Sequence, residues 1–187
     1  MTPQKKIVVI SGPSGVGKTT VCARLLRQEP RLRSCITTTT RPPRPGEING
    51  HDYYFISRKQ FATRIKQGQL LEYTEIFGNL YGTPKKSVTA ILSHGKYPLL
   101  RVDVLGARKL KKQGYQGVYI FLLPPDLTTL KKRLRKRGDI TETNLRQRLA
   151  RVKKEMPYKK QYDFQVVNDK LDRTVKEIKS ILRNHFF

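Results

Sequence analysis

The stretch "GPSGVGKT" (residues 12–19) decides the fold, because it matches the phosphate-binding pattern G-x-x-x-x-G-K-[ST]. It follows an apolar run, "KIVVIS" (residues 6–11), and opens a stretch with helical periodicity. Glycines let successive backbone N–H groups turn toward phosphate oxygens at a helix N-terminus, whose dipole favours anions. The pattern in this context predicts a nucleoside triphosphate site rather than an ordinary turn.

Within this loop the side chains have distinct expected roles. Lys18 is expected to reach the β- and γ-phosphates, and the Thr19 hydroxyl is expected to bind Mg²⁺, the cofactor that accompanies ATP. The residues expected to form the triphosphate site are Ser11, Gly12, Pro13, Ser14, Gly15, Val16, Gly17, Lys18, Thr19 and Thr20.

Beyond the loop, short apolar or β-branched runs alternate with amphipathic stretches, which is typical of a parallel sheet flanked by helices. Strands are predicted at 6–11, 34–38, 98–103, 118–123 and 164–168. Helices are predicted at 18–28, 86–94, 105–113, 126–137, 142–156 and 171–184. The predicted fold is α/β: a P-loop NTPase core with a parallel five-stranded sheet.

Residues 39–84 break this alternation. "DYYFIS" (52–57) and "LLEYTEIF" (70–77) are predicted strands around a helix that begins with a Ser57–Gln60 capping box and ends at Gly68. The segment therefore indicates an inserted subdomain with a small mixed sheet of its own.

Charge is the most unusual feature of the composition. The 187 residues include 39 Lys and Arg against 14 Asp and Glu, a formal net charge of +25, which favours polyanionic partners. The two cysteines show no metal-ligand or redox spacing. No run approaches the ~20 apolar residues of a membrane span, and the N-terminal apolar run is too short for a signal peptide. We expect a cytoplasmic protein without a membrane partner, and both a monomer and a homo-oligomer remain open.

The stretch "TTTTRPPRPGEINGHDYYF" (37–55) has neither helical nor strand periodicity. Its prolines stiffen a loop in which Arg41 and Arg44 can present two planar guanidinium groups to one phosphate, and Tyr53 can add a donor. A solvated basic loop is the alternative on this stretch alone. The nearby "LLEYTEIFGNLYGTP" (70–84) supplies a carboxylate and hydroxyls to the same subdomain.

Together these motifs resemble the guanylate kinases. The phosphate loop, both stretches just quoted, "RLRKRG" (133–138) and "VVND" (166–169) follow the order and spacing of that family. The resemblance implies transfer of the ATP γ-phosphoryl group to GMP, and to dGMP, giving ADP and GDP (dGDP from dGMP). It also implies one domain over 4–184, with a core (4–38, 85–137 and 157–187), a GMP-binding subdomain (39–84) and a helical lid (138–156).

The resemblance also implies roles for individual residues. Positions matching Thr37, Arg41, Arg44, Tyr53 and Tyr81 hold GMP mainly through its phosphate, and those matching Glu72 and Thr83 bind guanine. Arg133 and Arg137 would contact ATP, Arg148 the transferring phosphate and Asn168 the adenine. The implied catalytic set is Lys18, Arg41, Asp103, Arg137 and Arg148. For the basic neighbours of Arg133, a solvated helix face is the simpler interpretation.

Elementary chemistry agrees with this assignment. A carboxylate at Glu72 can accept the adjacent N1–H and N2–H of guanine, whereas adenine would leave the charge facing an unpaired N1 acceptor. The acceptor of the reaction is already an anionic phosphate oxygen, so no general base is required. The histidines, His51, His94 and His185, are expected at the surface.

One position departs from the family. The family's acidic residue two places before the aspartate of "D-I-D" is Arg101 here, in "LLRVDVLGA" (99–107), and Leu105 replaces a usual glutamine. We expect Arg101 to pair with Asp103 or another acid and to be tolerated.

Three other functions stay open from the sequence. The first is a catalytically silent guanylate-kinase-like interaction module, against which the intact phosphate loop and arginines argue. The second is a basic nucleic-acid-binding protein, for which no reading motif is present, although non-specific binding of RNA or DNA at low salt is expected. The third is a kinase for another nucleoside monophosphate, which leaves Glu72 with Thr83 unexplained.

Overall fold

The computed structural model describes residues 6–135 and 141–187. A five-stranded parallel sheet forms its centre, with strand order β2-β7-β1-β8-β9. The strands are β1 (Ile7–Ser11), β2 (Leu32–Ser34), β7 (Tyr97–Arg101), β8 (Gly117–Leu123) and β9 (Phe164–Val167). Every residue of β1 is buried, as expected for a central strand covered on both faces. The predicted α/β core is confirmed.

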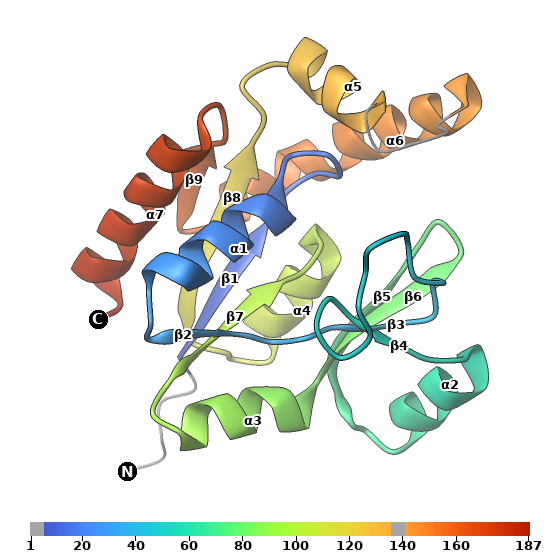
Figure 1. Cartoon of the computed structure of the whole chain (residues 1–187), viewed down its shortest axis with the longest axis vertical. Coiled ribbons are helices and arrows are strands. Elements are labelled where there is room, and N and C mark those ends of the chain that lie inside the picture. The colour runs from blue at the N-terminus through green and yellow to red at the C-terminus, as the bar shows by residue number, and fades with distance from the viewer. Residues whose placement is uncertain (1–5, 136–140) are drawn as a thin grey trace.

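Helices cover both faces of this sheet (Figure 1). On one face, α1 (Lys18–Gln28) and α7 (Leu171–His185) pack buried residues such as Leu25 and Ile178 against the strands. On the other, α3 (Lys85–Ser93) and α4 (Val104–Lys112) contribute Val88 and Leu110 to a second cluster. Ile10 of β1 belongs to the first cluster and Val9 to the second, so the strand that leads into the phosphate loop is packed on both faces.

A second, four-stranded sheet with order β4-β3-β6-β5 confirms the predicted small mixed sheet. Its elements are β3 (Thr38–Thr39), β4 (Tyr54–Phe55), α2 (Arg58–Lys66), β5 (Leu70–Ile76) and β6 (Asn79–Pro84). Ser57 and Gln60 form the predicted capping box at the start of α2. The limits assigned to the subdomain and the lid remain a prediction.

The predicted core strand at 34–38 is wrong in its limits. The core strand is Leu32–Ser34, paired with β7, whereas Thr38 and Thr39 pair with Gly82 and Tyr81 of β6 in the second sheet. The apolar and β-branched run therefore crosses from one sheet to the other, and it carries Thr37 to the space between them.

The segment after β8 carries a helical pair, α5 (Leu127–Arg135) and α6 (Glu142–Glu155), followed by the 3₁₀ helix η1 (Met156–Gln161). Leu130 and Leu134 pack against Leu145 and Val152 in a separate apolar cluster. Figure 1 shows this pair lying beyond the end of the core sheet. The predicted Arg137 lies outside the described residues.

Within the described ranges, no helix has the length and apolar character required to cross a membrane. His51, His94 and His185 are exposed, as predicted.

Candidate active site

A cavity of about 180 Å³ opens between the phosphate loop, the second sheet and α6. It brings together most of the site residues that the sequence predicts. Those lining it are Gly12, Ser14, Gly15, Gly17, Lys18, Thr19, Thr37, Arg41, Arg44, Tyr53, Glu72, Tyr81, Asp103 and Arg148. Of the remainder, Ser11 is buried at the end of β1, Pro13 and Val16 are buried in the loop, Thr20 is exposed on α1, and Thr83 donates its hydroxyl to Glu72.

The phosphate loop joins β1 to α1. Lys18 at the first position of α1 donates from Nζ to the carbonyl of Gly12 at 2.5 Å and to that of Pro13 at 3.0 Å, so the ammonium lies across the loop. Gly17 has a φ of +98°, and a Cβ there would lie 2.4 Å from Nδ2 of Asn168. The loop therefore needs glycine at this point, and it leads directly into the N-terminus of α1, where a helix dipole favours an anion.

Arg133 and Asn168 support this loop from outside the cavity. Nη1 of Arg133 donates to the Asn168 carbonyl at 2.9 Å, and Nδ2 of Asn168 donates to the Val16 carbonyl at 2.7 Å. Thr174 donates its hydroxyl to Oδ1 of Asn168 at 3.2 Å, which fixes the amide. Both predicted ATP-site residues thus meet the loop.

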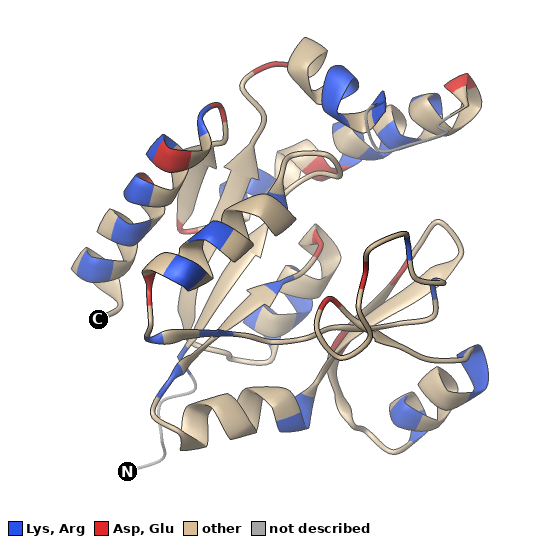
Figure 2. Cartoon of the chain, viewed as in Figure 1, with Lys and Arg blue, Asp and Glu red and all other residues tan. Residues whose placement is uncertain are grey.

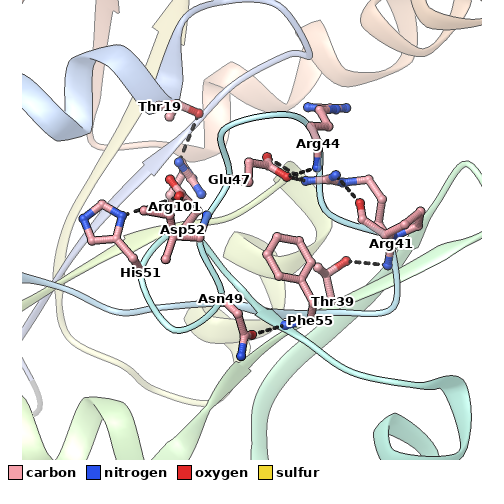
Figure 3. Close-up of polar contacts among 12 residues, drawn as sticks. Thr19, Thr39, Arg41, Arg44, Glu47, Asn49, His51, Asp52, Phe55 and Arg101 are labelled. Atoms are coloured by element: carbon pink, nitrogen blue, oxygen red, sulfur yellow. Dashed lines mark hydrogen bonds and ion pairs between the residues drawn. The ribbon is translucent and has the colours of Figure 1, made fainter.

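Arg41 and Arg44 extend from the Pro-rich loop toward the same cavity (Figure 3). Nη2 of Arg41 donates to both carboxylate oxygens of Glu47 at 2.8 Å, and the Arg44 backbone N–H donates to one of them at 2.8 Å. Burial alone would raise the pKa of Glu47, but the Arg44 N–H and the Arg41 guanidinium hold this pKa below its usual value. The sequence analysis did not single out Glu47, which ties these two arginines together.

Glu72 is the most buried acidic residue in the described ranges. Its side chain accepts a hydrogen bond from the Thr83 hydroxyl at 2.7 Å, and only 4% of the residue is exposed. Burial raises the pKa of Glu72 to about 7, the Thr83 hydrogen bond opposes this shift, and the nearby Asp103 reinforces it. A Cβ on Gly106 would lie 2.6 Å from Glu72 Oε2, so the glycine leaves room for the carboxylate.

Asp103 belongs to an ion-pair network with α6. One of its oxygens accepts the Gly106 N–H at 2.8 Å at the start of α4, and the other accepts Nη2 of Arg151 at 3.0 Å. Arg151 also pairs with Glu155 at 2.6 Å. The sequence missed Arg151, although it lies three residues after Arg148 and hence on the same helical face.

Arg101 does not make the predicted pair with Asp103. Its Nη1 donates to the Thr19 hydroxyl at 3.0 Å, and its Cζ lies 5.1 Å from the centre of the Tyr53 ring. The Asp103 carboxylate pairs with Arg151 of α6 instead. Figure 3 shows the Arg101 guanidinium between Thr19 and the loop that carries Asp52.

The guanylate kinase family model matches residues 4–185. The chain belongs to the guanylate kinase family. A guanylate kinase from Desulfitobacterium hafniense is 44% identical over 94% of this chain and 88% of its own length. One from Lactobacillus delbrueckii subsp. bulgaricus is 46% identical over 97% of this chain and 90% of its own length. The resemblance inferred from the motifs is thus confirmed.

Two solved structures give the same result for the fold of this guanylate kinase family member. The crystal structure of guanylate kinase from Anaplasma phagocytophilum superposes with a TM-score of 0.77, at 31% identity over 98% of this chain and 87% of the other. Shikimate kinase from Bacteroides thetaiotaomicron, at 14% identity and a TM-score of 0.55 over 95% of this chain and 98% of the other, shares only the fold.

Two oxygen-bearing side chains on the cavity suit Mg²⁺, the ion that guanylate kinases would use together with ATP. Across residues 6–135 and 141–187, no group of three or more His, Cys, Asp or Glu residues could hold a metal by itself. Thr19 and Asp103 nevertheless place a hydroxyl and a carboxylate on the cavity. Mg²⁺ usually keeps several waters and takes one or two protein ligands plus substrate phosphates, so these residues fit it.

Proposed function

We propose that this chain transfers the γ-phosphoryl group of ATP to GMP, and to dGMP, giving ADP and GDP (dGDP from dGMP). The observation that carries the proposal is the meeting of two sites on one cavity: the phosphate loop with Lys18, and the buried Glu72 paired with Thr83. The first accepts a triphosphate, and the second accepts a base with adjacent donors.

Guanine is the base that this carboxylate prefers. Ionised Glu72 accepts two N–H groups from guanine, and Thr83 holds the carboxylate from behind. Adenine would leave a buried charge unpaired, which costs roughly 1–3 kcal/mol or more. The family usually has serine where Thr83 stands, and the threonine keeps the hydroxyl.

Phosphate binding and transfer rest on positioned cations. Arg41, Arg44, Tyr53 and Tyr81 hold the GMP phosphate, with Thr37 beside them. Lys18 follows the charge on the ATP β- and γ-phosphates, and Arg148 reaches the transferring group from α6. Arg137 is proposed to join them, and Arg133 and Asn168 hold the ATP side.

The GMP phosphate is already anionic, so the protein works by orientation and charge without taking up a proton. Mg²⁺, when bound, neutralises charge on the phosphate oxygens. Thr19 is the proposed direct ligand, and Asp103 would act from the outer shell. The proposed location of the reaction is the cytoplasm.

A coupled assay of ADP release with a panel of nucleoside monophosphates tests the proposal. GMP should be preferred over AMP by tenfold to a few hundredfold in kcat/KM, the ratio expected from one unpaired buried group. Glu72→Gln should erode this preference, because the amide can turn a donor toward adenine N1. Binding of ATP and GMP without any transfer would instead indicate the interaction module.

The charge of +25 favours a second, weaker activity. Figure 2 shows Lys and Arg spread over α1, α2 and α4–α7. Exposed examples on the α5–α6 pair are Lys131, Lys132, Arg135, Arg146, Lys153 and Lys154. We propose non-specific binding of RNA or DNA at low salt that collapses toward ~200 mM salt. A titration that shows no binding at low salt, or no salt dependence, contradicts this.

A further inference from the structure

Arg101 lies where the two substrate sites meet. It is the last residue of β7, and its backbone pairs with Ile10 of β1, just before the phosphate loop. Its guanidinium donates to Thr19 on the ATP side and lies 5.1 Å from the Tyr53 ring on the GMP side. Thr19, Tyr53 and Arg101 all line the same cavity, so Arg101 lies between the proposed ATP site and the proposed GMP site.

The charge of Arg101 is not neutralised by an ion pair. Among the described residues, no carboxylate oxygen lies within 4.0 Å of its guanidinium, in contrast to Arg41 and Arg151. The Ile48 N–H, which donates to the Asp52 carboxylate, holds the pKa of Asp52 below its usual value, and the charge of Arg101 adds to this shift.

Two other arginines on this cavity, Arg44 and Arg148, are likewise without an ion pair among the described residues. Burial, together with the charge of Arg44, lowers the pKa of Arg148, which shows that the two guanidinium groups repel each other. Like charges that lie close together repel one another, and an anionic ligand placed between them lowers this repulsion. The three arginines Arg44, Arg101 and Arg148 therefore give this cavity an affinity for phosphate groups.

We propose that Arg101 is a further catalytic residue, whose guanidinium binds the phosphate groups at the junction between ATP and GMP. This inference rests on the proposed function. An oxygen of GMP attacks the γ-phosphorus, the bond from that phosphorus to the β–γ bridging oxygen breaks, and ADP keeps the electron pair. Arg101 neither gives nor takes a proton in this step. Its positive charge stabilises the negative charge that the transition state spreads over the β- and γ-phosphates of ATP and the phosphate of GMP.

This role differs from the tolerance expected from the sequence. A guanidinium fork matches phosphate oxygens directly, whereas a carboxylate at this position repels them unless a cation lies between. The family's acidic residue at this position would need a bound cation to face phosphate groups, whereas Arg101 supplies a positive charge of its own.

Binding of a bisubstrate analogue, adenosine and guanosine joined by five phosphates, measures this contact without turnover. Calorimetry in EDTA leaves only protein cations to face the phosphates. We expect Arg101→Gln to weaken binding by about ten- to a hundredfold, the usual effect of losing a charged hydrogen bond. With Arg, Lys, Gln or Asp at position 101, affinity for the analogue should fall in that order. The control is Arg108→Gln, which removes an exposed charge from α4 and should change the affinity less than twofold.

Turnover and folding complete the test. Arg101→Gln should lower kcat for GMP while ADP affinity and the melting temperature stay near wild-type values. If Gln fails to fold, the Lys and Asp variants carry the same comparison. Equal affinities across the series in EDTA, or faster transfer by Arg101→Asp, would overturn the role of Arg101. A wild-type protein that does not phosphorylate GMP would instead overturn the proposed function.

Discussion

Arg41 and Glu47 form a two-pronged ion pair, in which both carboxylate oxygens lie 2.8 Å from Nη2 of the arginine. The same carboxylate accepts the Arg44 N–H at 2.8 Å and so closes the turn between the two arginines. Glu47 therefore sets the direction of Arg41 toward the cavity before any phosphate arrives.

Removing the charge of Glu47 should weaken the GMP site. Glu47→Gln is expected to raise KM for GMP about three- to tenfold, because a neutral amide gives up part of the roughly 1.5–3 kcal/mol of a charged hydrogen bond that orders Arg41. KM for ATP should stay constant. Glu75→Gln, at an exposed position of β5, is the matched control. Steady-state kinetics with an unchanged KM for GMP would show that Arg41 needs no such support.

Lys18 should be indispensable for transfer and dispensable for folding. Lys18→Ala is expected to reduce kcat by about two to three orders of magnitude, as is typical for loss of one group that stabilises transition-state charge. The melting temperature should change little, because Nζ of Lys18 donates to the loop carbonyls of Gly12 and Pro13 and belongs to none of the apolar clusters of the core. Near-wild-type turnover would remove the phosphate loop from the mechanism.

The buried Glu72 should make base binding depend on pH. Since its pKa is raised to about 7 and guanine needs the ionised form, affinity should rise with pH. Between pH 6 and 8 the ionised fraction grows roughly tenfold. Guanosine, which lacks the titrating phosphate, is the ligand to measure by calorimetry. An affinity for guanosine that is flat over this range, or equally steep in Glu72→Gln, contradicts the assignment.

The raised pKa of Glu72 should make the folded protein less stable as pH rises, whereas guanosine binding strengthens. Glu72 has a higher pKa in the folded protein than when unfolded, so its contribution is fully present below the unfolded pKa and is lost as pH rises through about 7. Denaturant unfolding should therefore show the wild type losing stability relative to Glu72→Gln between pH 4.5 and 7. Parallel curves for the two proteins would exclude this linkage.

Gly106 should be required for the position of Glu72. Gly106→Ala places a methyl group 2.6 Å from Glu72 Oε2, so the carboxylate must move. We expect KM for GMP to rise about tenfold, since a misplaced buried carboxylate loses one guanine hydrogen bond of roughly 1 kcal/mol or more. ATP affinity should be unaffected. Leu105→Ala, the exposed neighbour on α4, should behave as wild type, and identical kinetics of both variants would refute the packing argument.

The sequence predicts the parts of this protein that depend on local pattern. The phosphate loop, the apolar strands of the core and the Ser57 cap follow from spacing and residue type, and they are confirmed. The strand at 34–38 was misplaced because threonines suit either sheet, and only pairing with β6 decides between them. Local spacing places Arg151 on the same helical face as Arg148, but its pairing with Asp103 spans 48 residues and the contact of Arg101 with Thr19 spans 82, and such distant partners leave no local signal.

The most direct test of the account is the fate of the phosphoryl group itself. The purified protein is incubated with γ-labelled ATP, Mg²⁺ and equal amounts of GMP and AMP, and the products are separated. The account predicts that label moves to GDP, that labelled ADP from AMP is scarce, and that Glu72→Gln narrows the difference. Label that stays in ATP, or that reaches AMP and GMP equally, would contradict it.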